Sequence, residues 1–239
     1  MVRVAKIKFD PAPKFSDPRE MPAYSIPIAA HYLRLPTTTL RDWVFGKNYR
    51  TKSGTNRFEP VIDLADKQGH LLSFFNLTEA HILRAFRAKH DIAMKAIRAA
   101  IDFVRTKYDS PHPLLEKVFS TNGVHLFVEH LQSVVEVSGG GQLVFPEVAV
   151  HFERLEYDDR QVRRFYPFTR PHGTGPKTMF IDPSLSFGRP VLASICVPTS
   201  NIAQRLTAGE SVKELADDYG CPQKEIEEAI RCELLFAAA

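Results

Sequence analysis

The chain is predicted to be mainly α-helical with small β-hairpins, an α+β protein in which two different helical units flank a central region. Three observations support this fold class. Two short helical patterns lie on either side of residue 35, apolar residues recur at helical spacing between residues 76 and 104, and three compact helical segments follow residue 197. We therefore expect a winged helix-turn-helix part at residues 23–75 and a three-helix, homeodomain-like domain at residues 179–239.

Residues 1–22 are expected to form an extended arm, and the first helix begins just after it. Ser25 can cap this helix, and Pro27 is tolerated in its first turn because the missing N–H has no helical partner there. After a tight turn at residues 34–36, a second helix is expected at residues 37–45. The inward-facing residues of the two helices are Ile26, Ala29, Ala30, Leu33, Leu40, Trp43 and Val44. Two short helices so close together fit a helix-turn-helix, and a packed helical pair that binds nothing is the alternative.

The second helix and the segment after it contain the candidate nucleic-acid contacts. Side chains such as Thr38 and Arg41 have the length and polarity that suit base edges in a major groove. From His31 to Arg57 the chain holds six Lys or Arg residues and one acidic residue, a density that suits phosphate contacts. The predicted DNA-binding set is Thr38, Arg41, Asp42, Lys47, Arg50, Lys52 and Arg57. Residues 58–64 and 71–75 predict a hairpin that would serve as a wing.

This arrangement resembles the DNA-binding heads of MerR-type regulators, where Ser/Pro-x-Thr-Leu-Arg-x-Trp/Tyr is typical. The segment Thr39-Leu40-Arg41-Asp42-Trp43 matches that pattern in part. Asp42 stands at the second x, where these regulators usually have an aromatic residue. The resemblance implies that the first part of the chain binds DNA.

Residues 76–168 predict a central α+β region, which we expect to hold a dimer interface. A helix capped by residues 76–79 should run to about Lys89, and a second should end before Pro111. The expected remainder is a hairpin at residues 124–129 and 133–137, a helix at residues 146–155 and a strand at residues 163–168. Residues 169–178 contain two Pro and two Gly and form the predicted linker.

Charge divides the chain into two unlike halves. Residues 1–110 hold 19 Lys or Arg and 11 Asp or Glu, a balance of +8, whereas residues 111–239 hold 12 and 17, a balance of −5. The first half suits a polyanion and the second a basic protein partner, unless the charges segregate by chance on a solvated surface. Three cysteines without paired spacing favour a reducing compartment. No apolar run reaches the roughly 20 residues needed to span a bilayer, so we expect a cytoplasmic protein without membrane contact.

The last quarter of the chain predicts a strand, a turn and three short helices. The first helix should span residues 198–207. The second begins at Ser211, and Glu214 three residues later completes a capping box; Gly220 supplies its stop. The third begins near Pro222, with Ile226, Ala229, Ile230 and Leu234 on one face.

This quarter resembles a known family. The segments Asp182-Pro183…Gly188-Arg189-Pro190-Val191-Leu192 and Leu206-x-x-Gly209-x-Ser211-x-x-Glu214-Leu215-Ala216-x-x-Tyr219 are similar to the domain of unknown function 433. That domain occurs in bacterial antitoxins of VapB type. The family usually continues its Gly-x-Pro-Val motif with Gly-Thr-Arg, and here Ser194, Ile195 and Cys196 stand at those positions. Residues 73–87 also resemble the central region of these antitoxins.

The resemblance implies that the protein represses its own operon as a dimer and neutralises a PIN-like, VapC-type ribonuclease toxin. Such a toxin has an acidic Mg²⁺-binding pocket and a basic RNA-binding rim, so glutamates would face the rim and an arginine would enter the pocket. The toxin-binding candidates are Arg189, Glu225, Glu227, Glu228, Arg231, Leu235 and Phe236. The apolar tail residues Leu235 and Phe236 either anchor a partner or close the local core.

Two other functions remain possible from the sequence: a stand-alone MerR-like regulator with a ligand-sensing C-terminal domain, and an enzyme that acts on nucleic acid. The sequence offers no convincing catalytic residues for the enzyme. Residues 172–178 resemble a phosphate loop only superficially, because Pro176 removes a backbone donor and the glycine spacing is wrong. The three nearby residues His125, Glu129 and His130 are a weak metal candidate. We expect no enzyme activity and no cofactor.

Overall fold

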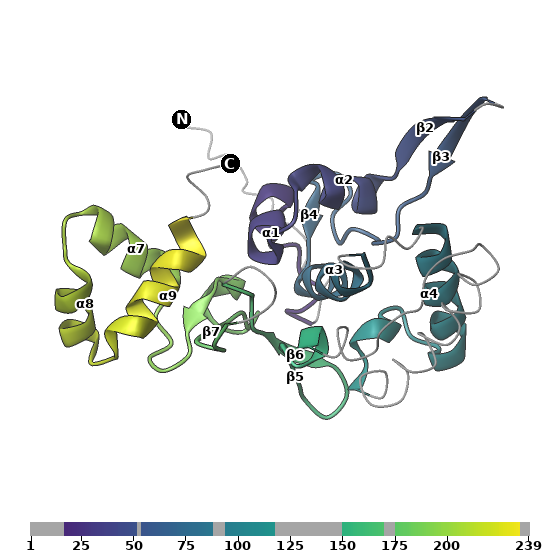
Figure 1. Ribbon diagram of the computed structural model, residues 1–239. Helices are drawn as coiled ribbons and strands as arrows, with labels where there is room; N and C mark the ends of the chain where they lie inside the picture. Colours follow the sequence, from purple (N-terminus) through teal and green to yellow (C-terminus); the bar gives the residue numbers. More distant parts are fainter. Residues whose placement is uncertain (1–16, 52–53, 88–93, 118–149, 170–174, 235–239) are drawn as a thin grey trace, which may run out of the picture.

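A computed structural model describes residues 17–51, 54–87, 94–117, 150–169 and 175–234 (Figure 1). Within these ranges the protein is mostly helical and has small two-stranded antiparallel sheets. The helices are α1 (Ile26–Leu33), α2 (Thr37–Phe45), α3 (Phe74–Arg87), α4 (Met94–Tyr108), α7 (Thr199–Thr207), α8 (Val212–Tyr219) and α9 (Gln223–Leu234), with short 3₁₀ turns η1 (Pro113–Leu115) and η4 (Ser186–Gly188). The strands are β1 (Tyr24–Ser25), β2 (Lys47–Thr51), β3 (Gly54–Phe58), β4 (Leu71–Leu72), β5 (Leu155–Tyr157), β6 (Val162–Phe165), β7 (Met179–Phe180) and β8 (Val191–Leu192).

The first two helices form the helix-turn-helix that the sequence predicts, with the same bounds. The Ser25 side chain accepts a hydrogen bond from the backbone N–H of Ile28 and so caps α1. Arg34 ends α1 in the left-handed conformation (φ 50°), and its N–H satisfies the carbonyls of the last turn. Every residue predicted to face inward is buried.

The predicted wing is wrong in position. The hairpin consists of β2 and β3, which pair from Lys47 opposite Phe58 to Thr51 opposite Gly54. The basic segment that follows the two helices, for which no strand was predicted, is therefore itself the hairpin. Pro60, which lacks an N–H, lies just beyond β3. Strand β4 instead pairs with β1, so it closes the helix-turn-helix rather than extending from it.

The helix predicted to begin at Asn76 starts two residues earlier. The Ser73 hydroxyl accepts the backbone N–H of Asn76 and caps α3, so Phe74 and Phe75 lie in the helix rather than in a strand. Farther along, Leu155 begins β5, which pairs with β6, and the helix expected at residues 146–155 does not extend to its predicted end. The expected hairpin at residues 124–137 and the centre of the linker, residues 170–174, lie outside the described residues.

The C-terminal helices pack together around their own apolar cluster, which includes Ile202, Leu215 and Ile226. The predicted capping box is present: the Ser211 side chain accepts the N–H of Glu214, and the Glu214 side chain accepts the N–H of Ser211. One inward position was wrong. Leu234 is 58% exposed, because the α9 face that packs inward includes Glu228 and Cys232.

A second, larger apolar cluster joins α1–α4 with β5 and β6. Among the described residues, three buried or half-buried side chains join α1 and β1 to the C-terminal region. Tyr24 donates to the Gly188 carbonyl (2.9 Å), the His31 ring Nε2 lies 2.6 Å from the Cys232 carbonyl, and Arg34 Nε donates to the Phe168 carbonyl (2.5 Å). The helix-turn-helix is thus hydrogen-bonded directly to the C-terminal domain.

Candidate functional site

Two of the predicted DNA contacts, Thr38 and Arg41, lie on the exposed face of α2. Thr38 is exposed, and the exposed Arg41 places its guanidinium 5.6 Å from the Phe45 ring centre. Asp42 differs, because its carboxylate forms an ion pair with Lys47 Nζ at 3.0 Å. This contact neutralises the single acid of the segment beside the start of β2.

The β2–β3 hairpin projects away from the helical body in Figure 1. Opposite residues in an antiparallel pair lie on the same face, so the register assigns Asn48, Arg50, Thr55 and Arg57 to one face of the ribbon. That face is polar and cationic throughout. Arg57 also contacts Glu59, at 3.1 Å, close to the body of the protein. Lys52, the remaining predicted contact, lies outside the described residues.

The base of the hairpin is fixed to the helices. Gly46 has φ 75°, and a Cβ there would lie 2.2 Å from the Phe58 carbonyl oxygen, so the strands can approach only at a glycine. Arg98 of α4 stacks 5.0 Å from the Phe58 ring centre and donates to the Glu59 carbonyl. Rigid attachment of this kind would hold the hairpin in a defined direction relative to α2.

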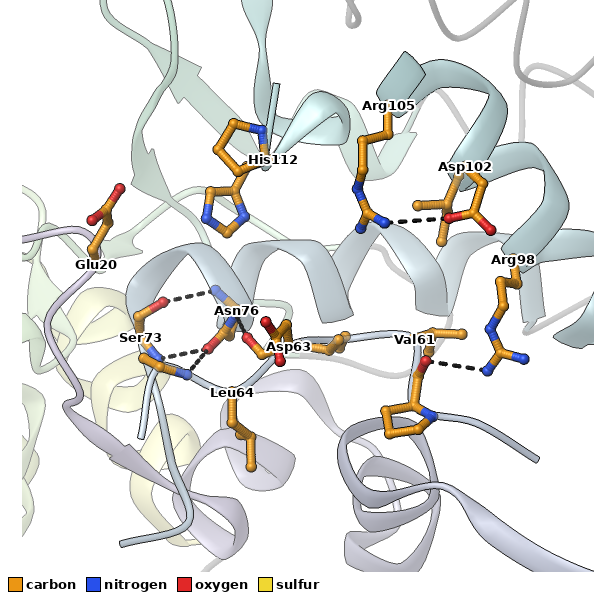
Figure 2. A pocket seen from close by; sticks show the side chains of 15 residues that line it. Glu20, Val61, Asp63, Leu64, Ser73, Asn76, Arg98, Asp102, Arg105 and His112 are labelled. Atoms are coloured by element: carbon orange, nitrogen blue, oxygen red, sulfur yellow. Dashed lines mark hydrogen bonds and ion pairs between the residues drawn. The ribbon is translucent and has the colours of Figure 1, made fainter. Parts of the chain in front are cut away.

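A cavity of about 730 Å³ lies between the segment 60–65, the start of α3, and α4. Figure 2 shows hydrogen bonds and an ion pair among the residues that line it. Asn76 accepts the N–H groups of Ala65 and Ser73 and donates to the Asp63 carbonyl, whereas Arg105 pairs with Asp102 at 3.2 Å. A ligand in this cavity would have to compete with these contacts.

His112, at the edge of this cavity, binds Glu79 through its Nδ1 at 2.9 Å. Burial opposes protonation of the ring, yet the Glu79 carboxylate outweighs burial and raises the pKa of His112. No sequence motif indicated the cavity, because five separate segments of the chain form its wall.

The predicted toxin-binding residues do not form one accessible surface. Arg189 and Glu227 are exposed, whereas Glu225 accepts a hydrogen bond from the Ser194 hydroxyl. The prediction that Glu228 contacts a partner was wrong, because this residue is only 3% exposed. The partners of this carboxylate are the Thr169 hydroxyl (2.5 Å) and Arg231 Nη1 (2.6 Å).

Glu228 is therefore an internal acceptor that joins α9 to Thr169, and it is not a contact for a basic rim. Leu235 and Phe236 lie outside the described residues. Beside α9, a hollow of about 540 Å³ has the apolar side chains Leu206, Val212 and Ile230 in its wall, with Glu227 and Arg231 alongside. This hollow combines apolar area with both signs of charge.

Chemical groups suited to catalysis are sparse. In the part of the chain that the structure describes, no three His, Cys, Asp or Glu side chains gather as metal ligands. The weak metal candidate at His125, Glu129 and His130 lies outside that part. Burial raises the pKa of Cys232 to about 12, which keeps this thiol protonated. No helix among the described residues is long and apolar enough to cross a membrane.

Comparison with known protein families matches both ends of this architecture. Residues 180–231 match the family described as "Protein of unknown function (DUF433)", and residues 22–101 match the family described as "Putative DNA-binding HTH domain". The chain thus has a DUF433 domain behind a helix-turn-helix domain. The second match extends through α3 and into α4, so it includes the β2–β3 hairpin and part of the cavity wall.

Two curated proteins of Mycobacterium tuberculosis H37Rv are similar over most of this chain. "Putative antitoxin VapB45" is 25% identical across 88% of this chain and 93% of its own length. "Uncharacterized protein Rv2308" is 24% identical across 82% and 83%, respectively. The crystal structure of Rv2018 from the same organism has a similar fold, with a TM-score of 0.62 at 24% identity, covering 88% of this chain and 98% of that one.

Proposed function

We propose that this protein is the antitoxin of a type II toxin–antitoxin system. It would neutralise a PIN-like ribonuclease toxin by direct binding and repress its own operon by binding operator DNA. The observation that carries the proposal is the pairing of a DNA-binding type of domain with a DUF433 domain in one chain. A relative that is similar over most of this chain is named an antitoxin. Relatives of this kind favour a protein without enzyme activity.

In the proposed DNA complex, α2 lies in the major groove and the β2–β3 hairpin acts as a wing. Thr38 and Arg41 would read base edges because both are exposed on the second helix of the pair. Arg50 and Arg57 would contact phosphates, since they share the polar face of a ribbon whose base is fixed to α4. The ion pair between Asp42 and Lys47 neutralises a carboxylate that would otherwise repel the phosphates at this surface.

In the proposed toxin complex, the hollow beside α9 receives an apolar element of the partner. Leu206, Val212 and Ile230 would supply the apolar area, and the neighbouring Glu227 would face a basic rim. Arg189 is exposed and free to approach an acidic pocket, whereas Arg231 already holds Glu228. Arg189 is therefore the better candidate for that role.

DNA binding is tested by fluorescence anisotropy with the DNA upstream of the gene and with unrelated DNA. Arg41→Ala should relax sequence preference by about 1–3 kcal/mol. Arg50→Ala should weaken binding to all sequences and reduce the slope of log K against log salt by about 1, because one phosphate contact is lost. Lys213→Ala, an exposed cation on α8, is the matched control and should change neither quantity. Unchanged binding in both arginine variants would contradict the DNA-binding assignment.

The stand-alone regulator is the second candidate, and the 730 Å³ cavity between the helix-turn-helix and α4 favours it. Its volume lies within the range of roughly 300–1,000 Å³ typical of small-molecule sites. A ligand there would contact the base of the hairpin through Arg98. Thermal-shift screening of small metabolites tests this function, and a stabilising ligand whose effect disappears in Arg105→Ala would support it.

A further inference from the structure

The turn between β7 and β8 has an unusual backbone. Its residues Ser186, Phe187 and Gly188 are in succession left-handed, with φ values of 47°, 56° and 72°. Only glycine adopts this region without a steric penalty, so two of the three positions are strained. Strain of this kind persists where the surrounding structure imposes it, and it is concentrated at functional sites.

The strained turn presents an aromatic ring to solvent. Phe187 is 92% exposed, so its side chain adds almost nothing to the core of the monomer. The turn cannot easily shift, because Tyr24 donates a hydrogen bond to the Gly188 carbonyl, and a Cβ on Gly188 would lie 2.4 Å from the Tyr24 hydroxyl. The chain thus fixes the backbone from which the Phe187 side chain projects outward, which lowers the backbone entropy lost on binding.

An apolar hollow of about 270 Å³ lies directly beside this ring. Residues from three segments form its wall, and they include Met21, Pro22, Phe74 and Pro183. Met21 is itself 42% exposed, so the hollow opens into an exposed apolar surface. The protein therefore carries a projecting aromatic ring and an apolar recess next to each other.

We propose that this surface binds a second copy of the same chain, with Phe187 of each copy seated in the hollow of the other. In a two-fold dimer the same patch of each copy faces the other, so this patch must be complementary to itself. A projecting aromatic ring beside an apolar recess meets that requirement. The charges beside the hollow agree: Glu20 precedes Met21, Arg189 follows Gly188, and both are exposed. In the proposed dimer Glu20 of one copy would face Arg189 of the other, so the copies need not repel.

This inference deepens the proposed function and rests on it for its purpose, since a repressor of a palindromic operator acts as a dimer. It places the dimer contact on residues 18–24, Phe74 and the turn after β7. The sequence had placed that contact within residues 76–168. Other residues line the hollow beside α9 that is proposed for the toxin. Arg189 borders the dimer surface as well, so the dimer and the toxin would compete for this side chain.

The test is sedimentation velocity across a concentration series, together with thermal unfolding of each variant. The wild-type chain should dimerise, and Phe187→Asn should raise the dimer dissociation constant at least tenfold. Thermal stability of the Phe187→Asn monomer should be equal or higher, because asparagine tolerates left-handed φ and no buried contact is lost. Leu234→Asn is the matched control, because it removes another exposed apolar side chain that does not line the hollow beside Phe187. This variant should dimerise as the wild type does.

Either of two results would overturn the inference: a wild-type chain that is monomeric at every concentration, or a Phe187→Asn variant whose dimer is as tight as the wild type. A monomer that still binds upstream DNA would refute the dimer surface and leave the proposed function standing. Loss of toxin capture in Phe187→Asn without any wild-type dimer would assign the surface to the toxin instead.

Discussion

Gly188→Ala is expected to weaken the junction between the helix-turn-helix and the C-terminal domain. Alanine at φ 72° costs about 1–2 kcal/mol. Its Cβ would also lie 2.4 Å from the hydroxyl of the buried Tyr24, so the 2.9 Å hydrogen bond to the Gly188 carbonyl must break or distort. A buried phenol that loses its acceptor costs about 1–3 kcal/mol more. The free energy of unfolding should fall by about 2–5 kcal/mol in all.

Gly220 provides a matched control for the backbone part of this cost. It has φ 65°, and no described atom lies within 4 Å of the position that a Cβ would take. Gly220→Ala should therefore cost only the conformational part, about 1–2 kcal/mol. Thermal melts report both, because about 1 kcal/mol shifts Tm by about 2–4 °C in a chain of this size.

A double-mutant cycle with Tyr24→Phe isolates the contact itself. Without the hydroxyl, the nearest Tyr24 atom to the new Cβ is the ring carbon at 3.3 Å, so Gly188→Ala should then cost little more than Gly220→Ala. The coupling free energy should be about 1–3 kcal/mol. Equal costs for Gly188→Ala and Gly220→Ala in the wild-type background would refute the role assigned to Tyr24.

Two further predictions concern buried ionisable groups. Burial, assisted by the positive charges of Arg84 and Arg154, lowers the pKa of His151 to about 4. As the pH falls, the unfolded chain therefore binds this proton at a higher pH than the folded chain does. The contribution of His151 to stability is complete above about pH 6.5, and up to about 3 kcal/mol is lost as the pH falls toward about 4. Urea unfolding at both pH values should show this loss, and His151→Phe should reduce it; an unchanged loss would contradict the assignment. Arg231→Ala should lower stability by about 1–3 kcal/mol, because it removes a partner of buried Glu228. Glu227→Ala, at the exposed neighbouring position, should cost less than about 0.5 kcal/mol, and similar costs for the two variants would contradict this reasoning.

Local signals in the sequence were sufficient to predict the caps of α1 and α8. Ser25 and the Ser211–Glu214 pair satisfy backbone donors within three residues, so the sequence itself contains both partners of each cap. Positions of strands were harder to predict, because β1 and β4 are two residues each and too short for an alternating pattern. The β2–β3 hairpin has little apolar alternation because its strands are largely exposed, so the sequence held no strand signal there.

The candidate site was predictable where it depends on one helix and unpredictable where it depends on distant segments. Thr38 and Arg41 are exposed because Leu40 and Trp43 occupy the inward face of the same helix. The burial of Glu228 depends on Thr169, which is 59 residues away in the sequence. Periodicity alone offers no means of finding such a partner, so the glutamate was predicted to be exposed.

The central claim, that this chain is an antitoxin, is tested most directly by co-purification. The tagged full-length chain is expressed with the product of the adjacent gene, and the isolated species is weighed by native mass spectrometry and assayed for ribonuclease activity. The account predicts a stoichiometric complex in which the activity of the partner is suppressed, and release of that activity when the partner is separated. A chain that is recovered without the partner, and that leaves its ribonuclease activity unchanged, would contradict the account.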